Sequence, residues 1–186
     1  MDTHDVVDAV DSAPSAKITL TYPSGKTVEF GKELKPEDVK DEPQVSWEAA
    51  PDKYYTLLMF DPDAPSRMEP KFADVKHWLV VNIQGCDVKT GELIAEYVGA
   101  GPPQGTDLHR YIFLVFEQKG KREFKEPKSG KLDREHRICW SMRKFRREND
   151  LGEAYAGNYF LAQWSPFVDE WRKQREMAAN NANKDN

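Results

Sequence analysis

The chain has 186 residues, of which 39% are hydrophobic and 11% aromatic, and this content is sufficient for one domain with a buried core. Wholesale disorder is therefore not expected. A formal net charge of −5 argues against a dedicated nucleic-acid-binding protein, because such proteins are normally basic.

The first 15 residues are small and acidic, and we expect them to form a loosely held arm. They lack the basic and apolar regions of a signal peptide. No later apolar run approaches the ~18 residues that a membrane span requires. The two cysteines, Cys86 and Cys139, have no disulfide or metal-binding spacing and are expected to be free thiols in a reducing compartment. The sequence therefore predicts a cytoplasmic protein of one domain, residues 1–186, with flexible tails at 1–15 and 180–186.

Short elements are predicted at the start of the domain. Lys17–Tyr22 alternates polar and apolar residues, and Thr27–Phe30 follows a turn, so these two strands are expected to form a hairpin. Pro36–Val39 is predicted as one helical turn, with proline at its first position. Val45–Trp47 is predicted as a third short strand.

The central strands are more apolar. Tyr54–Phe60 and Tyr111–Phe116 are short aromatic and apolar runs without a helical period, which indicates buried strands. His77–Ile83 contains a continuous apolar run, which predicts a strand that is buried on both faces. Between these strands, Cys86–Glu92 is predicted as a loop rich in turns.

The last part of the chain changes character. Lys119–Arg137 is densely charged and is predicted as a mobile loop. Trp140–Glu148 is predicted as a helix, Gly157–Trp164 as the last strand, and Pro166–Ala179 as a second helix. An apolar stripe on this second helix is expected to pack on the sheet or to cover a pocket rather than to touch a membrane. Many short strands followed by two helices predict an antiparallel β-sandwich with helices near the C-terminus.

Two polar, proline-stiffened segments follow buried strands. Asp61–Pro65 has two prolines, which fix the backbone and remove two donors. Gly99–Pro103 has glycines, which let a backbone approach a ligand closely, although the segment would also suit a plain turn. Together with His77 and His109, these segments place carboxylates, imidazoles and backbone N–H groups at strand ends. Such groups can form a pocket for a small anion.

These segments also resemble a known family. Asp61–Arg67 (DPDAPSR), His77–Asn82 (HWLVVN) and Gly99–Tyr111, which contains GAGPP and LHRY, are similar in type and order to segments of the phosphatidylethanolamine-binding proteins, also called Raf kinase inhibitor proteins. The similarity extends from about Lys17 to about Trp171. It implies a single domain of two antiparallel sheets with peripheral helices.

The resemblance further implies a small pocket for anions and phospholipid headgroups. The family's lining residues correspond in this chain to Asp61, Pro65, His77, Gly101 and His109. We add four neighbours from the same segments as candidate ligand-binding residues: Asp63, Gly99, Pro103 and Tyr111. No catalytic residue, bound metal or cofactor is expected.

Two acidic residues of the candidate site have alternative roles. Asp61 would repel an anion, so we expect it to accept a hydrogen bond from the His77 or His109 imidazole and to raise the pKa of that ring. It could also accept from the ammonium group of a headgroup. Asp63 either belongs to the site or caps the loop through an Asx-type hydrogen bond. Arg110 is expected to reach back to a loop carboxylate.

The chain departs from the family at two positions. Phe72 stands where many members carry a pocket tyrosine, which removes one hydroxyl donor. Lys76 stands before His77, where some members carry a second histidine. Its charge would favour an anion if the side chain pointed inward, but not if it faced solvent.

These features predict a monomeric, non-enzymatic binding protein without a cofactor. The expected ligands are phosphatidylethanolamine-type headgroups or phosphorylated protein segments, and by resemblance the protein would modulate a kinase cascade. The first alternative is a protease or kinase inhibitor that acts through its outer surface, with only a regulatory pocket. The second is a metal-dependent hydrolase, because Asp61, Asp63, His77 and His109 are possible metal ligands, although they lack a tight spacing.

Overall fold

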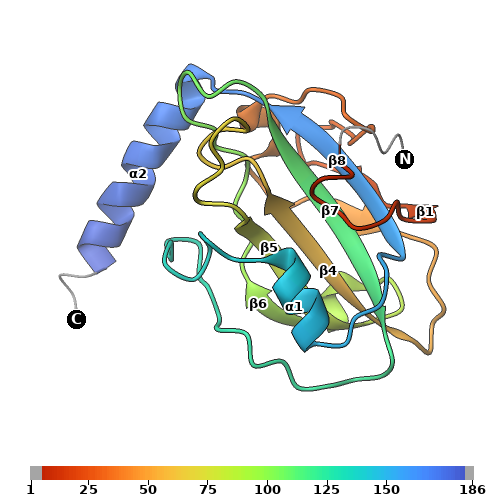
Figure 1. Ribbon diagram of the computed structural model, residues 1–186. Coiled ribbons are helices and arrows are strands. Elements are labelled where there is room, and N and C mark those ends of the chain that lie inside the picture. The colour runs from red at the N-terminus through yellow and green to blue at the C-terminus, as the bar shows by residue number, and fades with distance from the viewer. Residues whose placement is uncertain (1–5, 183–186) are drawn as a thin grey trace.

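A sheet of six strands dominates the computed structural model, which describes residues 6–182 (Figure 1). Its strands, in spatial order, are β1 (Ala16–Lys17), β8 (Ala156–Ala162), β7 (His109–Gln118), β4 (Tyr54–Asp61), β5 (Val75–Gln84) and β6 (Glu92–Ala95). A second sheet consists of the antiparallel pair β2 (Thr19–Thr21) and β3 (Gln44–Ser46). The helices are two short 3₁₀ turns, η1 (Pro36–Val39) and η2 (Val88–Thr90), followed by α1 (Met142–Glu148) and α2 (Pro166–Ala182).

This architecture confirms the predicted two-sheet β fold with helices near the C-terminus. The main sheet is mixed rather than purely antiparallel, because β1 runs parallel to β8 at one edge. All its other neighbouring strands are antiparallel.

The central strands β4, β5 and β7 are apolar on both faces because both faces of the sheet are covered. On one face, residues such as Leu57, Met59 and Trp78 belong to a core that also includes Leu20 and Trp47, from the region of the smaller sheet. The alternation of side chains along each strand sends the intervening residues to the opposite face. This explains why these strands read as continuous apolar runs.

The opposite face is covered by α1 and by the N-terminal segment (Figure 1). There Leu58 and Phe60 share a second core with Val6, Val10 and Phe145. The expectation of a loosely held arm over residues 1–15 is therefore wrong for residues 6–15, and residues 1–5 lie outside the described part of the chain. At the other end, α2 continues to residue 182, which includes part of the predicted tail; residues 183–186 are not described.

Two strand predictions also need correction. The hairpin between Lys17–Tyr22 and Thr27–Phe30 forms only over a few residues: the Tyr22 N–H donates to the Lys26 carbonyl, the Val28 N–H donates to the Leu20 carbonyl, and an isolated bridge joins Thr21 to Thr27. The 27–30 segment is not a strand, and the strand partner of β2 is β3. The edge strand β6 lies just after a segment predicted as loop and was not predicted.

The charged segment 119–137 is fixed at one end by a buried arginine. Arg137 is 4% exposed, and its guanidinium donates to five backbone carbonyls. The acceptors belong to Lys76, His77, Glu96, Ser129 and Gly130. Arg137 therefore ties the end of the segment to the start of β5. The prediction of a mobile loop did not include this attachment.

Trp78 offers a test of the core between the two sheets. It is 1% exposed and meets the Tyr97 ring edge-on, with the centroids 5.5 Å apart. Trp78→Ala should lower the free energy of unfolding by about 3–5 kcal/mol, because it removes a large buried side chain. Chemical denaturation measures this change. Leu93→Ala on the edge strand β6, where the side chain is 45% exposed, is the control and should cost less than about 1 kcal/mol. Equal losses for the two variants would contradict this assignment of the core.

Candidate functional site

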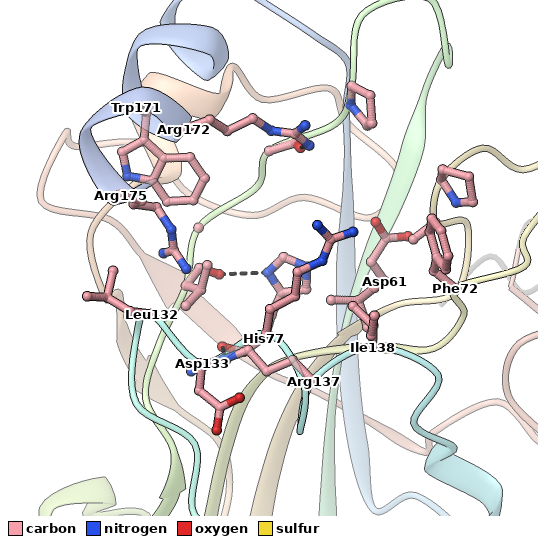
Figure 2. A pocket seen from close by; sticks show the side chains of 18 of the residues that line it. Asp61, Phe72, His77, Leu132, Asp133, Arg137, Ile138, Trp171, Arg172 and Arg175 are labelled. Carbon is pink, nitrogen blue, oxygen red and sulfur yellow. Dashed lines mark hydrogen bonds between the residues drawn. The ribbon is translucent and has the colours of Figure 1, made fainter. Parts of the chain in front are cut away.

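A cavity of about 380 Å³ opens at one end of the main sheet (Figure 2). The strand register explains its position: Asp61 at the end of β4 lies opposite Val75 at the start of β5, and His109 at the start of β7 lies opposite Ala162 at the end of β8. Four strand ends therefore meet at one edge. The volume is in the range of about 300–1,000 Å³ that is typical of small-molecule sites.

The structure brings together residues from three separate segments of the sequence. The candidate residues that line the cavity are Asp61, Pro65, His77, Gly99, Gly101, Pro103, His109 and Tyr111. The remaining candidate, Asp63, is not among the lining residues.

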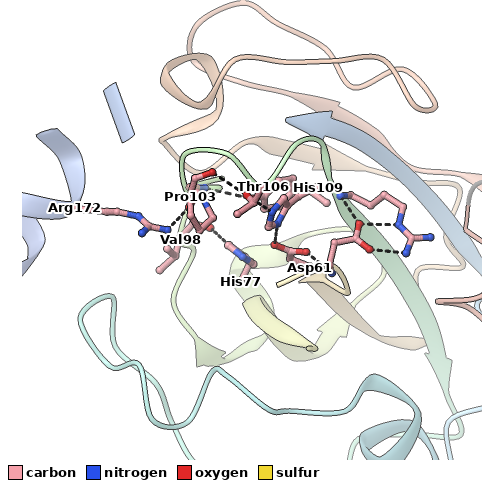
Figure 3. A network of polar contacts seen from close by, with 11 residues as sticks. Asp61, His77, Val98, Pro103, Thr106, His109 and Arg172 are labelled. Atoms are coloured by element: carbon pink, nitrogen blue, oxygen red, sulfur yellow. Dashed lines mark hydrogen bonds and ion pairs between the residues drawn. The ribbon is translucent and has the colours of Figure 1, made fainter. Parts of the chain in front are cut away.

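Asp61 is buried and its carboxylate is used within the protein (Figure 3). Its Oδ1 accepts from the backbone N–H of Asp63 at 2.7 Å, and its Oδ2 lies 2.9 Å from His109 Nδ1. The other ring nitrogen of His109, Nε2, lies 2.9 Å from the hydroxyl of Thr106. Thr106 in turn donates to the carbonyl of Pro103 at 2.8 Å. Asp61 therefore orients His109, and both ring nitrogens of His109 have protein partners.

His77 differs from His109 in having one ring nitrogen without a partner among the described residues. Its Nδ1 lies 2.7 Å from the carbonyl oxygen of Val98, so Nδ1 carries a proton and Nε2 is left for a ligand. Burial lowers the pKa of His77, which outweighs the opposite effect of the nearby Asp61 carboxylate, and Arg137 and Arg175 lower it further. The predicted increase in pKa through Asp61 is therefore not found for His77, and this ring is neutral at pH 7.

Close packing explains the glycines of the second segment. A Cβ on Gly99 would come within 2.7 Å of the carbonyl oxygen of Val39, and a Cβ on Gly101 within 2.9 Å of the Trp171 ring. The Gly101 N–H donates to the hydroxyl of Tyr111 at 3.3 Å, so it is not a free donor of an anion nest. These glycines let η1 and α2 approach the cavity wall.

Asp63 has a structural role, but through Arg110 rather than through the Asx-type hydrogen bond considered from the sequence. Its carboxylate accepts from the Arg110 guanidinium at 2.7 and 2.8 Å and from the Arg110 backbone N–H at 2.9 Å. The same guanidinium binds Asp8 of the N-terminal segment. The prediction that Arg110 reaches back to a loop carboxylate is confirmed, and Asp63 holds the loop instead of lining the cavity.

The side chains of Phe72 and Lys76, at the two positions noted as departures in the sequence, lie in different environments. Phe72 lines the cavity. Lys76 neither points into the cavity nor faces solvent: it is fully buried, with its Nζ 2.6 Å from Glu126 and 5.4 Å from the centroid of the Trp140 ring. Burial lowers the pKa of Lys76, whereas the Glu126 carboxylate raises it. Its charge is therefore used inside the fold.

Sequence reasoning missed the arginines of the cavity wall. Arg137, Arg172 and Arg175 all line it, together with Trp171 (Figure 2). Trp171 belongs to the predicted apolar stripe of α2, and Arg175 follows it by one helical turn. This spacing places Arg175 on the same face of the helix and could have identified it from the sequence. Arg137 lies in a run of charged residues and has no such signal.

Metal-binding clusters and membrane-spanning helices are both absent from residues 6–182. No three side chains of the His, Cys, Asp and Glu types converge there as a metal site would require. Neither helix of this region combines the length and apolar composition of a membrane span.

Comparisons with known proteins agree with this architecture. The model of the phosphatidylethanolamine-binding protein family matches residues 17–160. "Putative odorant-binding protein A5" of Drosophila melanogaster is 34% identical over 168 residues, which are 90% of this chain and 80% of that protein. The solution structure of CG7054 is 41% identical, with a TM-score of 0.73, and the match covers 90% of this chain and 95% of that one. Carboxypeptidase Y inhibitor, solved in complex with its cognate proteinase, is 25% identical with a TM-score of 0.73, covering 87% and 91% of the two chains.

The lowered pKa of His77 predicts that the cavity takes up anions more strongly at acid pH. A neutral His77 offers an acceptor at Nε2, and protonation below its ordinary pKa of ~6.5 turns that nitrogen into a charged donor. A bound anion favours the charged ring, so affinity should rise as pH falls. Sulfate is a suitable probe because its charge is constant between pH 7.5 and 5.5. Calorimetry at fixed ionic strength should show an increase of about three- to tenfold over this interval.

The variant His77→Gln is the control for this pH dependence, because glutamine is polar but does not titrate. It should bind sulfate with little change between the two pH values. An identical pH dependence in the variant and the wild-type protein would assign the effect to another group.

Proposed function

Since this chain belongs to the phosphatidylethanolamine-binding protein family, we propose that it binds phosphoryl groups in the cavity at the end of its main sheet. The ligand is a phosphatidylethanolamine-type headgroup or a phosphorylated protein segment, and the protein acts by binding rather than by catalysis. The two thiols are exposed and unpaired, which supports a reducing, cytoplasmic location. By occupying phosphorylated segments, the protein would modulate a kinase cascade.

The observation that carries the proposal is that Asp61 and His77 have different roles: Asp61 has partners within the protein, whereas His77 has a nitrogen left for a ligand. The negative charge of Asp61 is engaged by the Asp63 N–H and by His109, which reduces its repulsion of an anion. His77 keeps Nε2 for the ligand, and the Arg137 guanidinium lies in the same wall. Pro65 and Phe72 add apolar surface, which suits the carbon part of a headgroup.

One comparison favours a second function. Carboxypeptidase Y inhibitor, solved in complex with its cognate proteinase, matches 87% of the present chain. By this similarity, we propose as the alternative that the protein inhibits a proteinase through its outer surface. In that case the cavity would only regulate the inhibitor.

The direct test is a titration with phosphoethanolamine followed by NMR. We expect saturable shifts of the backbone amide of Gly101 and of the His77 ring, because both groups line the cavity. Gly120 is half-buried and does not line the cavity, so it serves as an internal control and should not shift. If no lining residue responds while the protein inhibits carboxypeptidase Y, the second function is favoured.

A substitution at Phe72 is expected to increase the affinity for phosphoethanolamine rather than to decrease it. Phe72→Tyr adds a hydroxyl to a ring that already lines the cavity. One new hydrogen bond to a phosphoryl oxygen should strengthen phosphoethanolamine binding by about fivefold, which corresponds to about 1 kcal/mol. Phe124→Tyr, in the core on the other face of the sheet, is the comparison and should not strengthen binding. Weaker binding by Phe72→Tyr would mean that the ring edge does not face the ligand.

A further inference from the structure

Helix α2 carries an arginine on the side that faces the cavity. Phe167, Trp171, Arg175 and Ala179 follow one another at intervals of four residues, and all four are less exposed than most of the helix. Trp171, Arg175 and Ala179 line the cavity. A stripe of this kind normally consists of apolar residues that pack on the body of the protein. The charged residue in it therefore calls for an explanation.

Two arginines of α2 are held at the cavity mouth by backbone carbonyls. Arg172 donates to the carbonyl of Gly101 at 2.6 Å, and Arg175 donates to the carbonyl of Lys131 (Figure 3 shows the contact of Arg172). The Arg175 guanidinium also lies over the Trp171 ring, 4.7 Å from its centroid. Among the described residues, neither guanidinium forms an ion pair with a carboxylate. Both therefore keep a full positive charge that no protein group neutralises directly.

The carboxylates of the cavity wall are directed elsewhere. Asp61 holds His109, and Asp133 lies 2.7 Å from His136 Nδ1. Glu176 is exposed on α2. The acidic groups near the mouth therefore leave Arg172 and Arg175 available.

The charges of the two arginines act on the interior of the cavity. Arg175 contributes to the lowered pKa of His77, after the larger effect of burial. Burial lowers the pKa of Arg175 itself, and the nearby Arg172 lowers it further. Two neighbouring cations that repel each other, of which Arg175 is partly desolvated, are unfavourable without an anion. Perturbed charged groups that gather in a cavity are typical of a functional site.

We propose that Arg172 and Arg175 form a second anion subsite at the mouth of the cavity, beside the phosphoryl subsite at His77. The preferred ligand then carries two negative groups: a phosphate ester, and a carboxylate close to the ester carbon. The planar guanidinium fork suits a carboxylate, and the Trp171 ring keeps that fork in place. This inference rests on the proposed function, because it requires that the inner subsite takes the phosphoryl group.

A matched pair of ligands tests the second subsite. O-phosphoserine differs from phosphoethanolamine only by a carboxylate on the carbon that carries the ammonium group. With the wild-type protein, calorimetry should give a dissociation constant about tenfold lower for O-phosphoserine. The pair glycerophosphoserine and glycerophosphoethanolamine repeats the comparison with phosphodiesters. A preference among the monoesters alone indicates a free phosphate ester as the ligand, whereas a preference among the diesters indicates a lipid headgroup.

The variants Arg175→Gln and Arg172→Gln should abolish most of this preference. The expected ratio between the two ligands is about twofold or less, while phosphoethanolamine still binds. Lys173→Gln is the matched control: it removes the same charge from an exposed position of α2 that does not line the cavity, and the preference should persist. Arg175→Lys keeps the charge without the planar fork and should restore only part of the preference.

The outcomes separate this inference from the proposed function. If the arginines only attach α2 to the body, their variants will weaken both ligands equally, and the second subsite is refuted. Equal affinity of the wild-type protein for both ligands would refute the second subsite as well, and would leave the phosphoryl subsite intact. If none of the four probes binds, both the proposed function and the second subsite are refuted.

Discussion

Two buried carboxylates, Asp61 at the end of β4 and Asp63 in the loop that follows, hold the functional edge of the protein in place. Each lies at the end of the sheet where burial would be costly without a partner. Asp63 meets this requirement through Arg110, and Asp61 through His109 and the backbone of its own loop. Three segments that are far apart in the sequence are thereby joined. Because both carboxylates have partners inside the protein, their repulsion of an anion is reduced, and the arginines supply positive charge at the cavity wall.

The central part of the fold was predictable because it depends on local sequence patterns. Continuous apolar runs identified β4, β5 and β7 as buried strands, and both faces of the sheet are indeed covered. The hairpin prediction was correct for the turn but not for a second strand over Thr27–Phe30. The strand partner of β2 is β3, at a distance in sequence that no local pattern reveals. The strand β6 was missed because an edge strand of four residues, exposed in its first half, has little pattern to detect.

The site was predictable in part for the same reason. The motif segments supplied the residues that the strand ends bring together, and Arg110 was correctly expected to bind a loop carboxylate. Which imidazole Asp61 would orient could not be known, because the choice depends on the register between β4 and β7. The contribution of Arg172 and Arg175 depends on where α2 lies after β8. The burial of Lys76 depends on a half-buried partner, Glu126, which lies fifty residues further along the chain. These are tertiary relations without a sequence signature.

The N-terminal segment shows that a family boundary is not a folding boundary. The similarity to the family begins at residue 17, but Val6 and Val10 lie in the core that covers the outer face of the main sheet. A chain shortened to start at Lys17 would leave that apolar face open to water, and such a surface favours self-association. It would also remove Asp8, one of the two acidic partners of Arg110, from the network that ends at the cavity loop. The residues that precede the family match therefore contribute to the solubility of the domain as well as to its structure.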